Sequence, residues 1–182
     1  NKADWLEGSW SGMVTAHGDD RRGDTAVDLD ILRAIGKSIT SLPKGMELNN
    51  KLVRIIKGRA DSIESGTGLD WATAEHLAFG SILLEGNPVR LSGQDSCRGT
   101  FSQRHAVFVD QKTEERYTPL SHLDEEQAAF EVIDSPLSEA SVMGFEYGFS
   151  QAEPNALVMW EAQFGDFANG AQVVINQFIS SG

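Results

Sequence analysis

A short apolar run that breaks at a proline and leads into a helix is the feature that most constrains this fold. Residues 130–133 have the composition of a strand, and Pro136 follows them closely. Ser135 suits the N-cap position and a proline suits the first helical position, so a helix is predicted over residues 137–150. Glu139 then lies in its first turn, where the helix dipole favours a carboxylate. Such a residue is either an ordinary helix-start carboxylate or the centre of a site.

Two further apolar runs complete the same plan. Residues 89–91, bounded by Pro88 and Gly93, indicate a buried strand, and residues 157–160 indicate a third one. A helical pattern over residues 167–179 follows the third strand. Its apolar positions on one face are Phe167, Ala171, Val174 and Phe178. Strands that alternate with helices predict an α/β fold with a mostly parallel sheet flanked by helices.

The part of the chain before the first strand has the pattern of helices. Residues 27–39 and 48–56 carry apolar side chains at helical spacing. A third helix is predicted over residues 71–84, with Asp70 as its opening residue and Gly86-Asn-Pro88 as its stop signal.

The sequence divides into two parts by composition. Residues 1–24 have little periodicity and are expected to be loop. We expect residues 1–66 to form a helical N-terminal segment and linker, and residues 67–182 to form an α/β core. The chain begins at Asn1 without a methionine, so we expect it to be part of a longer chain.

Composition narrows the classes of partner. The 182 residues are 40% hydrophobic, which is enough for a substantial core, and the net charge is −12. Nucleic acids and anionic membranes attract clustered Lys and Arg, so small molecules or proteins are the expected partners. The single cysteine, Cys97, excludes an intrachain disulfide and favours a reducing compartment, either the cytoplasm or an organelle matrix. No apolar run has the length of a membrane span.

Three polar loops follow the three predicted strands. They cover residues 92–105, 134–139 and 161–167. In an open parallel sheet the carboxyl ends of the strands meet at one edge, where ligands bind, so the loops are expected to form a cleft there. Phe164 in the third loop is either a core aromatic or part of that cleft.

Other site chemistries have little support in the sequence. It has no GxSxG elbow, no P-loop and no GxGxxG fingerprint, and its four histidines lack the spacing of zinc ligands, so no metal site is predicted. Cys97, near Arg98 and His105, is either a nucleophile or an inert thiol, and the second is the more frequent case. His76 is interpreted as a structural histidine. Two glycines four residues apart, Gly144 and Gly148, are predicted to allow close backbone packing.

Several specific strings carry a resemblance to a known family. They are Gly68-Leu-Asp-Trp-Ala72, Arg90-Leu-Ser-Gly-Gln-Asp95, Arg98-Gly-Thr-Phe101, Arg104-His-Ala106, Gly144-Phe-Glu-Tyr-Gly148 and Trp160-Glu-Ala-Gln-Phe-Gly-Asp-Phe167. From about Asp4 to Gly182 the chain resembles the decarboxylating first component of the 2-oxoglutarate dehydrogenase complex, a thiamine-diphosphate enzyme. Within that family it resembles the transketolase-like pyrimidine-binding domain.

The resemblance implies a role for each candidate site residue. Glu139 would be catalytic: it would hydrogen-bond N1′ of the aminopyrimidine and promote the imino tautomer that deprotonates the thiazolium carbon. Phe164 would pack on the pyrimidine face. Gln163 and Leu137 would be further cofactor contacts, although Leu137 could equally be a core residue. Residues with a less defined role, on the substrate side or behind the cofactor contacts, are Gln94, Asp95, Arg98 and His105.

The resemblance also implies substrates and partners. The enzyme would decarboxylate 2-oxoglutarate and pass the succinyl group to a lipoyl group on the second component, a step of the tricarboxylic acid cycle. The family works as a homodimer and holds the cofactor diphosphate through Mg²⁺ with a GDG motif on a separate domain. No GDG occurs in this sequence, so the chain alone is expected to be inactive.

Two alternatives stay open at this point. One is another thiamine-diphosphate enzyme, such as a pyruvate or branched-chain 2-oxoacid dehydrogenase or a 2-oxoglutarate decarboxylase. The other is a non-catalytic α/β binding domain, in which Glu139 only begins a helix.

Overall fold

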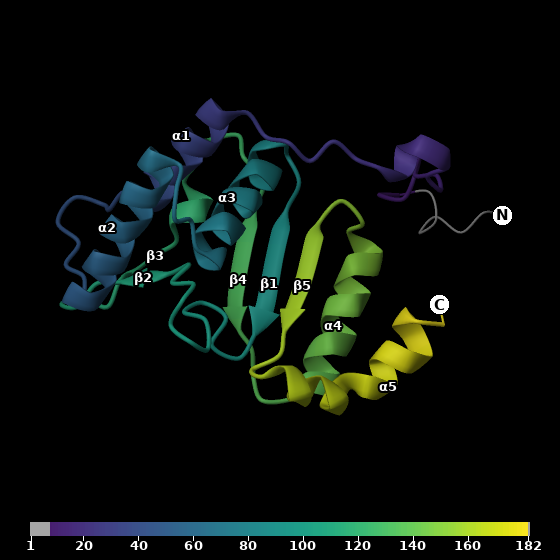
Figure 1. The fold of residues 1–182 in the computed structure, drawn as a ribbon. Helices are drawn as coiled ribbons and strands as arrows, with labels where there is room; N and C mark the ends of the chain where they lie inside the picture. Colours follow the sequence, from purple (N-terminus) through teal and green to yellow (C-terminus); the bar gives the residue numbers. More distant parts are fainter. Residues whose placement is uncertain (1–7, 182) are drawn as a thin grey trace.

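A three-stranded parallel sheet forms the centre of the molecule (Figure 1). A computed structural model describes residues 8–181, with only the backbone described at residues 20 and 21. The strands are β1 (Val89–Gly93), β4 (Phe130–Asp134) and β5 (Leu157–Glu161), in the order β4-β1-β5. Both pairings are parallel, and Val89 aligns with Phe130 on one side and Leu157 on the other. The predicted α/β class and all three predicted strands are therefore confirmed.

Along the chain, three of the longer helices precede β1 and the fourth follows β4 (Figure 1). The helices are α1 (Leu29–Ile39), α2 (Asn50–Ser65), α3 (Trp71–Leu84) and α4 (Glu139–Ala152). The α3 bounds agree with the sequence prediction because Asp70 caps the helix: its Oδ1 accepts a hydrogen bond from the Thr73 backbone N–H at 2.7 Å.

Short elements connect these units. They are the 3₁₀ helices η2 (Gly18–Arg21), η3 (Pro119–Ser121) and η4 (Gly165–Ala171), the hairpin strands β2 (Phe108–Val109) and β3 (Arg116–Tyr117), the helix α5 (Gln172–Val174) and the π-helix η5 (Ile175–Ile179). The antiparallel β2–β3 hairpin was not predicted, because two-residue strands leave no periodic signal.

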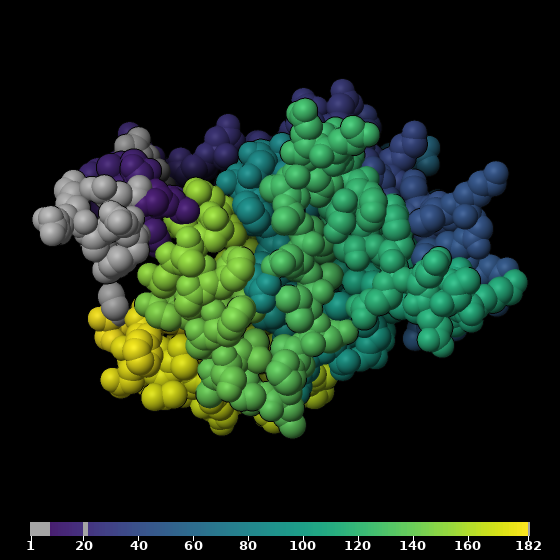
Figure 2. Space-filling view, turned by 180° about the vertical axis from the view of Figure 1, so that it is seen from behind, coloured from purple at the N-terminus to yellow at the C-terminus, as the bar shows by residue number. Residues whose placement is uncertain are grey.

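Alternation along β1 assigns the two faces of the sheet. Val89 and Leu91 are buried in the core with residues of α1 and α3, whereas Arg90 reaches Glu146 on α4. Seen from behind, α4 and the C-terminal helices lie next to each other (Figure 2). The core cluster consists of Ile35, Ile39, Leu77, Phe79, Leu83, Val89, Leu91, Ala106, Leu120 and Phe130.

The start of α4 differs from the sequence prediction. The helix begins at Glu139 with Ser138 as N-cap, so the assignment of Ser135 as N-cap is wrong. The Ser135 backbone N–H donates to the Gly93 carbonyl at 2.9 Å, which prolongs the sheet pairing past the end of β4. The helix begins after this bond, four residues later, at Glu139.

The C-terminal helical pattern is also broken in the structure. Residues predicted as one helix are divided among η4, α5 and η5. Gly165 and Gly170 lower helix propensity at the start of this segment. Of its predicted apolar face, Ala171 is fully buried, but Phe167 and Phe178 are 43% and 56% exposed.

Gly144 and Gly148 do not make the predicted close packing within the described residues. A Cβ built on either glycine meets nothing within 4 Å.

No helix in residues 8–181 is long and apolar enough to cross a membrane.

Gly93 is the glycine on which the sheet most depends. A Cβ added there would lie 2.2 Å from the Glu161 carbonyl oxygen and 2.7 Å from Ser96 Oγ. We expect Gly93→Ala to lower the free energy of unfolding by roughly 3 kcal/mol, because neighbouring backbone must move. Gly144→Ala, on an open helix surface, should instead add about 0.5–1 kcal/mol. Urea unfolding of both variants checks this, and equal effects would contradict it.

Candidate functional site

The three polar loops converge at the carboxyl edge of the sheet, as predicted. A small cavity there is lined from each of them, by Gln94 after β1, Glu139 at the start of α4 and Gln163 after β5. The other lining residues are Ser135, Pro136, Ser138, Val142, Trp160, Glu161 and Ala162. The cavity lies where ligands bind in open parallel sheets, because the strand ends leave their loops free there.

Glu139 borders this cavity from the first turn of α4. Its side chain is half-buried and lies against η4: a Cβ on Gly170 would be 3.1 Å from Glu139 Oε2. No group in residues 8–181 donates a hydrogen bond to its carboxylate, although the helix N-terminus favours the negative charge. The carboxylate is thus held in position with its hydrogen-bonding capacity available to a ligand.

A buried ion pair holds α4 against the sheet. Arg90 on β1 donates from Nε and Nη2 to the two Glu146 oxygens, at 2.7 and 3.0 Å, and it also pairs with Glu131. Its guanidinium lies over the Phe149 ring, 4.7 Å from the centroid. Bidentate geometry fixes orientation as well as distance, so the helix that carries Glu139 has a defined position on the sheet.

Phe164 belongs to an aromatic group beside the cavity. Its ring makes edge-to-face contacts with Phe101 at 5.9 Å and with Phe167 at 6.1 Å between centroids. Phe164 is 47% exposed, so it is not a core aromatic. Sequence reasoning assigned no role to Phe101, and its only signal was its position in a glycine-containing polar loop.

Gln163, Asp95 and Arg98 are brought together by the fold. Gln163 Nε2 donates to Asp95 Oδ2 at 3.1 Å, and Arg98 Nη2 pairs with the same oxygen at 3.0 Å. Arg98 Nη1 also donates to Ser102 Oγ at 3.2 Å. The loop after β1 and the loop after β5 are therefore joined across the sheet edge.

The remaining candidates lie at different depths. Leu137 is 77% exposed on the turn before α4, so the core interpretation is wrong. His105 does not line the cavity, and its buried Nε2 has no partner in the described part of the chain. Burial and the nearby Arg59 lower the pKa of His105.

The loop after β1 contains three non-glycine residues with left-handed backbone. They are Asp95, Ser102 and His105, with φ of 56°, 56° and 46°. Such conformations cost free energy and persist where the surroundings impose them.

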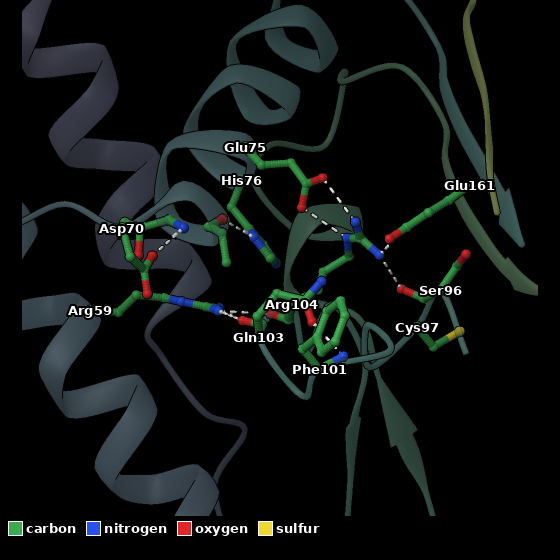
Figure 3. Close-up of polar contacts among 12 residues, drawn as sticks. Arg59, Asp70, Glu75, His76, Ser96, Cys97, Phe101, Gln103, Arg104 and Glu161 are labelled. Atoms are coloured by element: carbon green, nitrogen blue, oxygen red, sulfur yellow. Dashed lines mark hydrogen bonds and ion pairs between the residues drawn. The ribbon is translucent and has the colours of Figure 1, made fainter. Parts of the chain in front are cut away.

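Arg104 is the main residue that sequence reasoning missed (Figure 3). It is 5% exposed, and its Nε and Nη2 donate to Glu75 on α3 at 2.8 and 3.0 Å. Its Nη1 donates to the Ser96 carbonyl at 3.0 Å and lies 2.5 Å from Glu161 Oε2. The side chain was assigned no role because its partners lie 29, 8 and 57 residues away.

Cys97 has the environment of an inert thiol. It is 6% exposed, and its backbone N–H donates to Asp134 Oδ1 at 2.9 Å. Burial, together with Asp134, raises the pKa of Cys97, which disfavours the thiolate that a nucleophile needs. Among the side chains that the structure describes, no group of three His, Cys, Asp or Glu could hold a metal ion.

The sequence of the chain matches a known protein family. The model of the transketolase pyrimidine-binding domain matches residues 67–182, and the chain belongs to this family. It is also 57% identical, over an alignment of 184 residues, to the 2-oxoglutarate dehydrogenase E1 components of Brucella anthropi and Brucella canis, and 56% identical to that of Brucella melitensis. Each alignment covers the whole chain but only 18% of the relative, so the chain spans less than a fifth of their length.

His76 gives the fold a dependence on pH. It is 3% exposed on α3, with Nδ1 2.7 Å from the Ala72 carbonyl oxygen, which confirms it as a buried structural residue. Burial and the charge of Arg59 lower the pKa of His76 from 6.5 to about 3. Between these values the unfolded chain binds the proton and the folded chain does not, so stability is full above pH 6.5 and falls as the pH is lowered towards 3.

We expect the free energy of unfolding to fall by about 1.4 kcal/mol per pH unit through this group below pH 6. Urea unfolding of the chain between pH 7 and pH 4.5 measures it. His76→Gln should reduce the slope of unfolding free energy against pH by the amount that corresponds to one proton. The control His122→Gln, at an exposed position, should leave the slope unchanged. Equal slopes for His76→Gln and the unmodified chain would contradict the assignment.

Proposed function

We propose that this chain is the pyrimidine-binding part of a longer thiamine-diphosphate enzyme that decarboxylates 2-oxoglutarate. The observation that carries the proposal is Glu139, a carboxylate at a helix start whose oxygens accept no hydrogen bond from the described chain and which borders a cavity beside Phe164. The similarity of the whole chain to 2-oxoglutarate dehydrogenase E1 components supports the choice of substrate.

The residues present suit an aminopyrimidine ring. Such a ring has hydrogen-bonding nitrogens at its edge and flat apolar faces, so it needs a polar group in its plane and an aromatic or apolar side chain above it. Glu139 would bind N1′ and exchange a proton with it, and the half-exposed ring of Phe164 would pack on the pyrimidine. Gln163, held by Asp95, and the exposed Leu137 would be further contacts.

The cofactor, when bound, would supply a nucleophilic thiazolium carbon for the substrate keto group and a cationic ring that takes up the electron pair left by decarboxylation. The chain's own contribution is to hold that ring and to manage the proton at N1′. Glu139 can do so without a competing internal donor in residues 8–181, and Arg90 keeps its helix in place. The chain therefore has to supply one carboxylate for N1′ and one side chain that packs on the pyrimidine ring.

The dicarboxylate substrate would approach the loop after β1. Arg98 is about half exposed there, so it is the candidate for a substrate carboxylate, with Gln94 and Asp95 beside it. His105 is the last residue of this loop and does not line the cavity, so it would act on the site indirectly. The product acyl group would pass to a lipoyl group of a second component.

The diphosphate end of the cofactor needs ligands from elsewhere. The described residues offer no cluster for Mg²⁺, so we assign the ion and the diphosphate to another part of the longer protein. In this proposal residues 67–182 form the pyrimidine-binding unit, residues 1–66 are the helical segment and linker before it, and the active site is completed in a homodimer. The chain alone would then be inactive.

The test is 2-oxoglutarate-dependent reduction of an artificial electron acceptor by the full-length protein that carries this chain, with thiamine diphosphate and Mg²⁺ added. Glu139→Gln should keep the fold and reduce kcat by at least roughly a hundredfold, because the amide cannot exchange the N1′ proton. Glu125→Gln, at an exposed carboxylate that does not line this cavity, is the control and should leave the rate unchanged.

Substrate comparison decides among the alternatives. If pyruvate or a branched-chain 2-oxoacid is preferred and the activity still needs Glu139, the chain belongs to another enzyme of the same cofactor class. If Glu139→Gln behaves like Glu125→Gln, Glu139 only begins a helix and the proposal fails.

A further inference from the structure

Arg104 joins α3, the loop after β1 and the end of β5 (Figure 3). Its guanidinium binds Glu75 on α3 with two hydrogen bonds, the Ser96 carbonyl in the loop after β1, and Glu161 at the last position of β5. All of its three nitrogens are used. A planar fork can satisfy partners in several directions at once, which the compact ammonium of a lysine cannot.

Glu161 is the residue through which Arg104 can influence the site. It ends β5, aligned with Gly93 of β1, and it lines the same cavity as Glu139. The site residues Gln163 and Phe164 follow it by two and three positions. The position of the backbone at Glu161 therefore affects the positions of the Gln163 and Phe164 side chains.

The backbone of Arg104 fixes the other half of the same region. Its N–H donates to the Arg98 carbonyl at 3.0 Å, and its carbonyl accepts from Arg59 Nη2 at 2.7 Å. These bonds close the loop that presents Phe101 to Phe164. The same residue thus sets both members of the aromatic contact.

We propose that Arg104 is a positioning residue for the cofactor pyrimidine: by holding Glu161 and the loop after β1 in one rigid unit, it sets Phe164 and Gln163 opposite Glu139. The proposal rests on the proposed function for the identity of the ligand. Its structural part, the coupling of Arg104 to the segment after β5, holds for any ligand of this cavity.

The experiment uses the full-length protein and two variants, Arg104→Lys and Glu161→Gln, which each weaken the Arg104–Glu161 ion pair from one side. Asp110→Asn is the matched control, because Asp110 is a buried carboxylate that accepts backbone N–H bonds from Glu47, Lys112 and Thr113 and does not line the cavity. Two quantities are measured: amide hydrogen exchange of residues 162–167 without cofactor, and the Kd of thiamine diphosphate with Mg²⁺ from the quenching of intrinsic fluorescence.

We expect both site variants to exchange faster at residues 162–167 and to raise the Kd by roughly ten- to a hundredfold, since a displacement of about 1 Å can cost this much. The control Asp110→Asn should lower stability, but it should change neither the exchange at residues 162–167 nor the Kd. In a double-mutant cycle, Arg104→Lys and Phe164→Leu should be non-additive in the Kd, because the first acts through the second.

Unchanged exchange and a Kd like that of Asp110→Asn would overturn the proposal, and so would additive effects in the cycle. If Arg104→Lys does not fold, Glu161→Gln decides the question by the same readings. Failure of the proposed function has a different signature, because it leaves activity intact in Glu139→Gln and leaves the exchange result unaffected.

Discussion

The buried charge of Arg104 is the interaction on which the arrangement of the sheet edge depends. A guanidinium taken out of water is costly unless it is fully paired, and here it is paired with two carboxylates and a carbonyl from three elements. Breaking such a network costs more than breaking an exposed ion pair, because the remaining charges stay buried. Glu75 lies in the first half of α3, Ser96 follows β1 and Glu161 ends β5, so this one side chain joins the three elements.

A second arginine does the equivalent work on the other face of the sheet. Arg90 ties α4 to β1 through Glu146, itself only 4% exposed, and the aromatic rings of α4 cover its guanidinium. The sheet has only three strands, so apolar contact alone gives α4 a limited area. Directed bidentate bonds supply the orientation that a small contact area cannot. Glu139 and Phe164 are consequently positioned from opposite sides, each by a buried arginine.

The sequence predictions were correct where the deciding interactions are local in the sequence, and they were wrong where residues far apart in the chain interact. The strands and α3 were predicted because a run of apolar residues and the Asp70 cap are local signals. The start of α4 was misplaced because the Ser135–Gly93 bond joins residues 42 apart. The C-terminal segment was expected to be one helix, yet its apolar face meets too little of the core, so helix-breaking glycines decided its geometry.

The sequence by itself determined the α/β class, the three strands, the three loops at one sheet edge and the two residues, Glu139 and Phe164, on which the proposed site is centred. Only the tertiary structure decided which groups hold them there. Arg104, Glu75 and Glu161 carry no pattern along the chain, because a hydrogen-bonded charge network is defined by distances between segments. Hydrophobic periodicity and caps act within a few residues and can be read from the sequence, whereas the satisfaction of a buried charge exists only once the chain has folded.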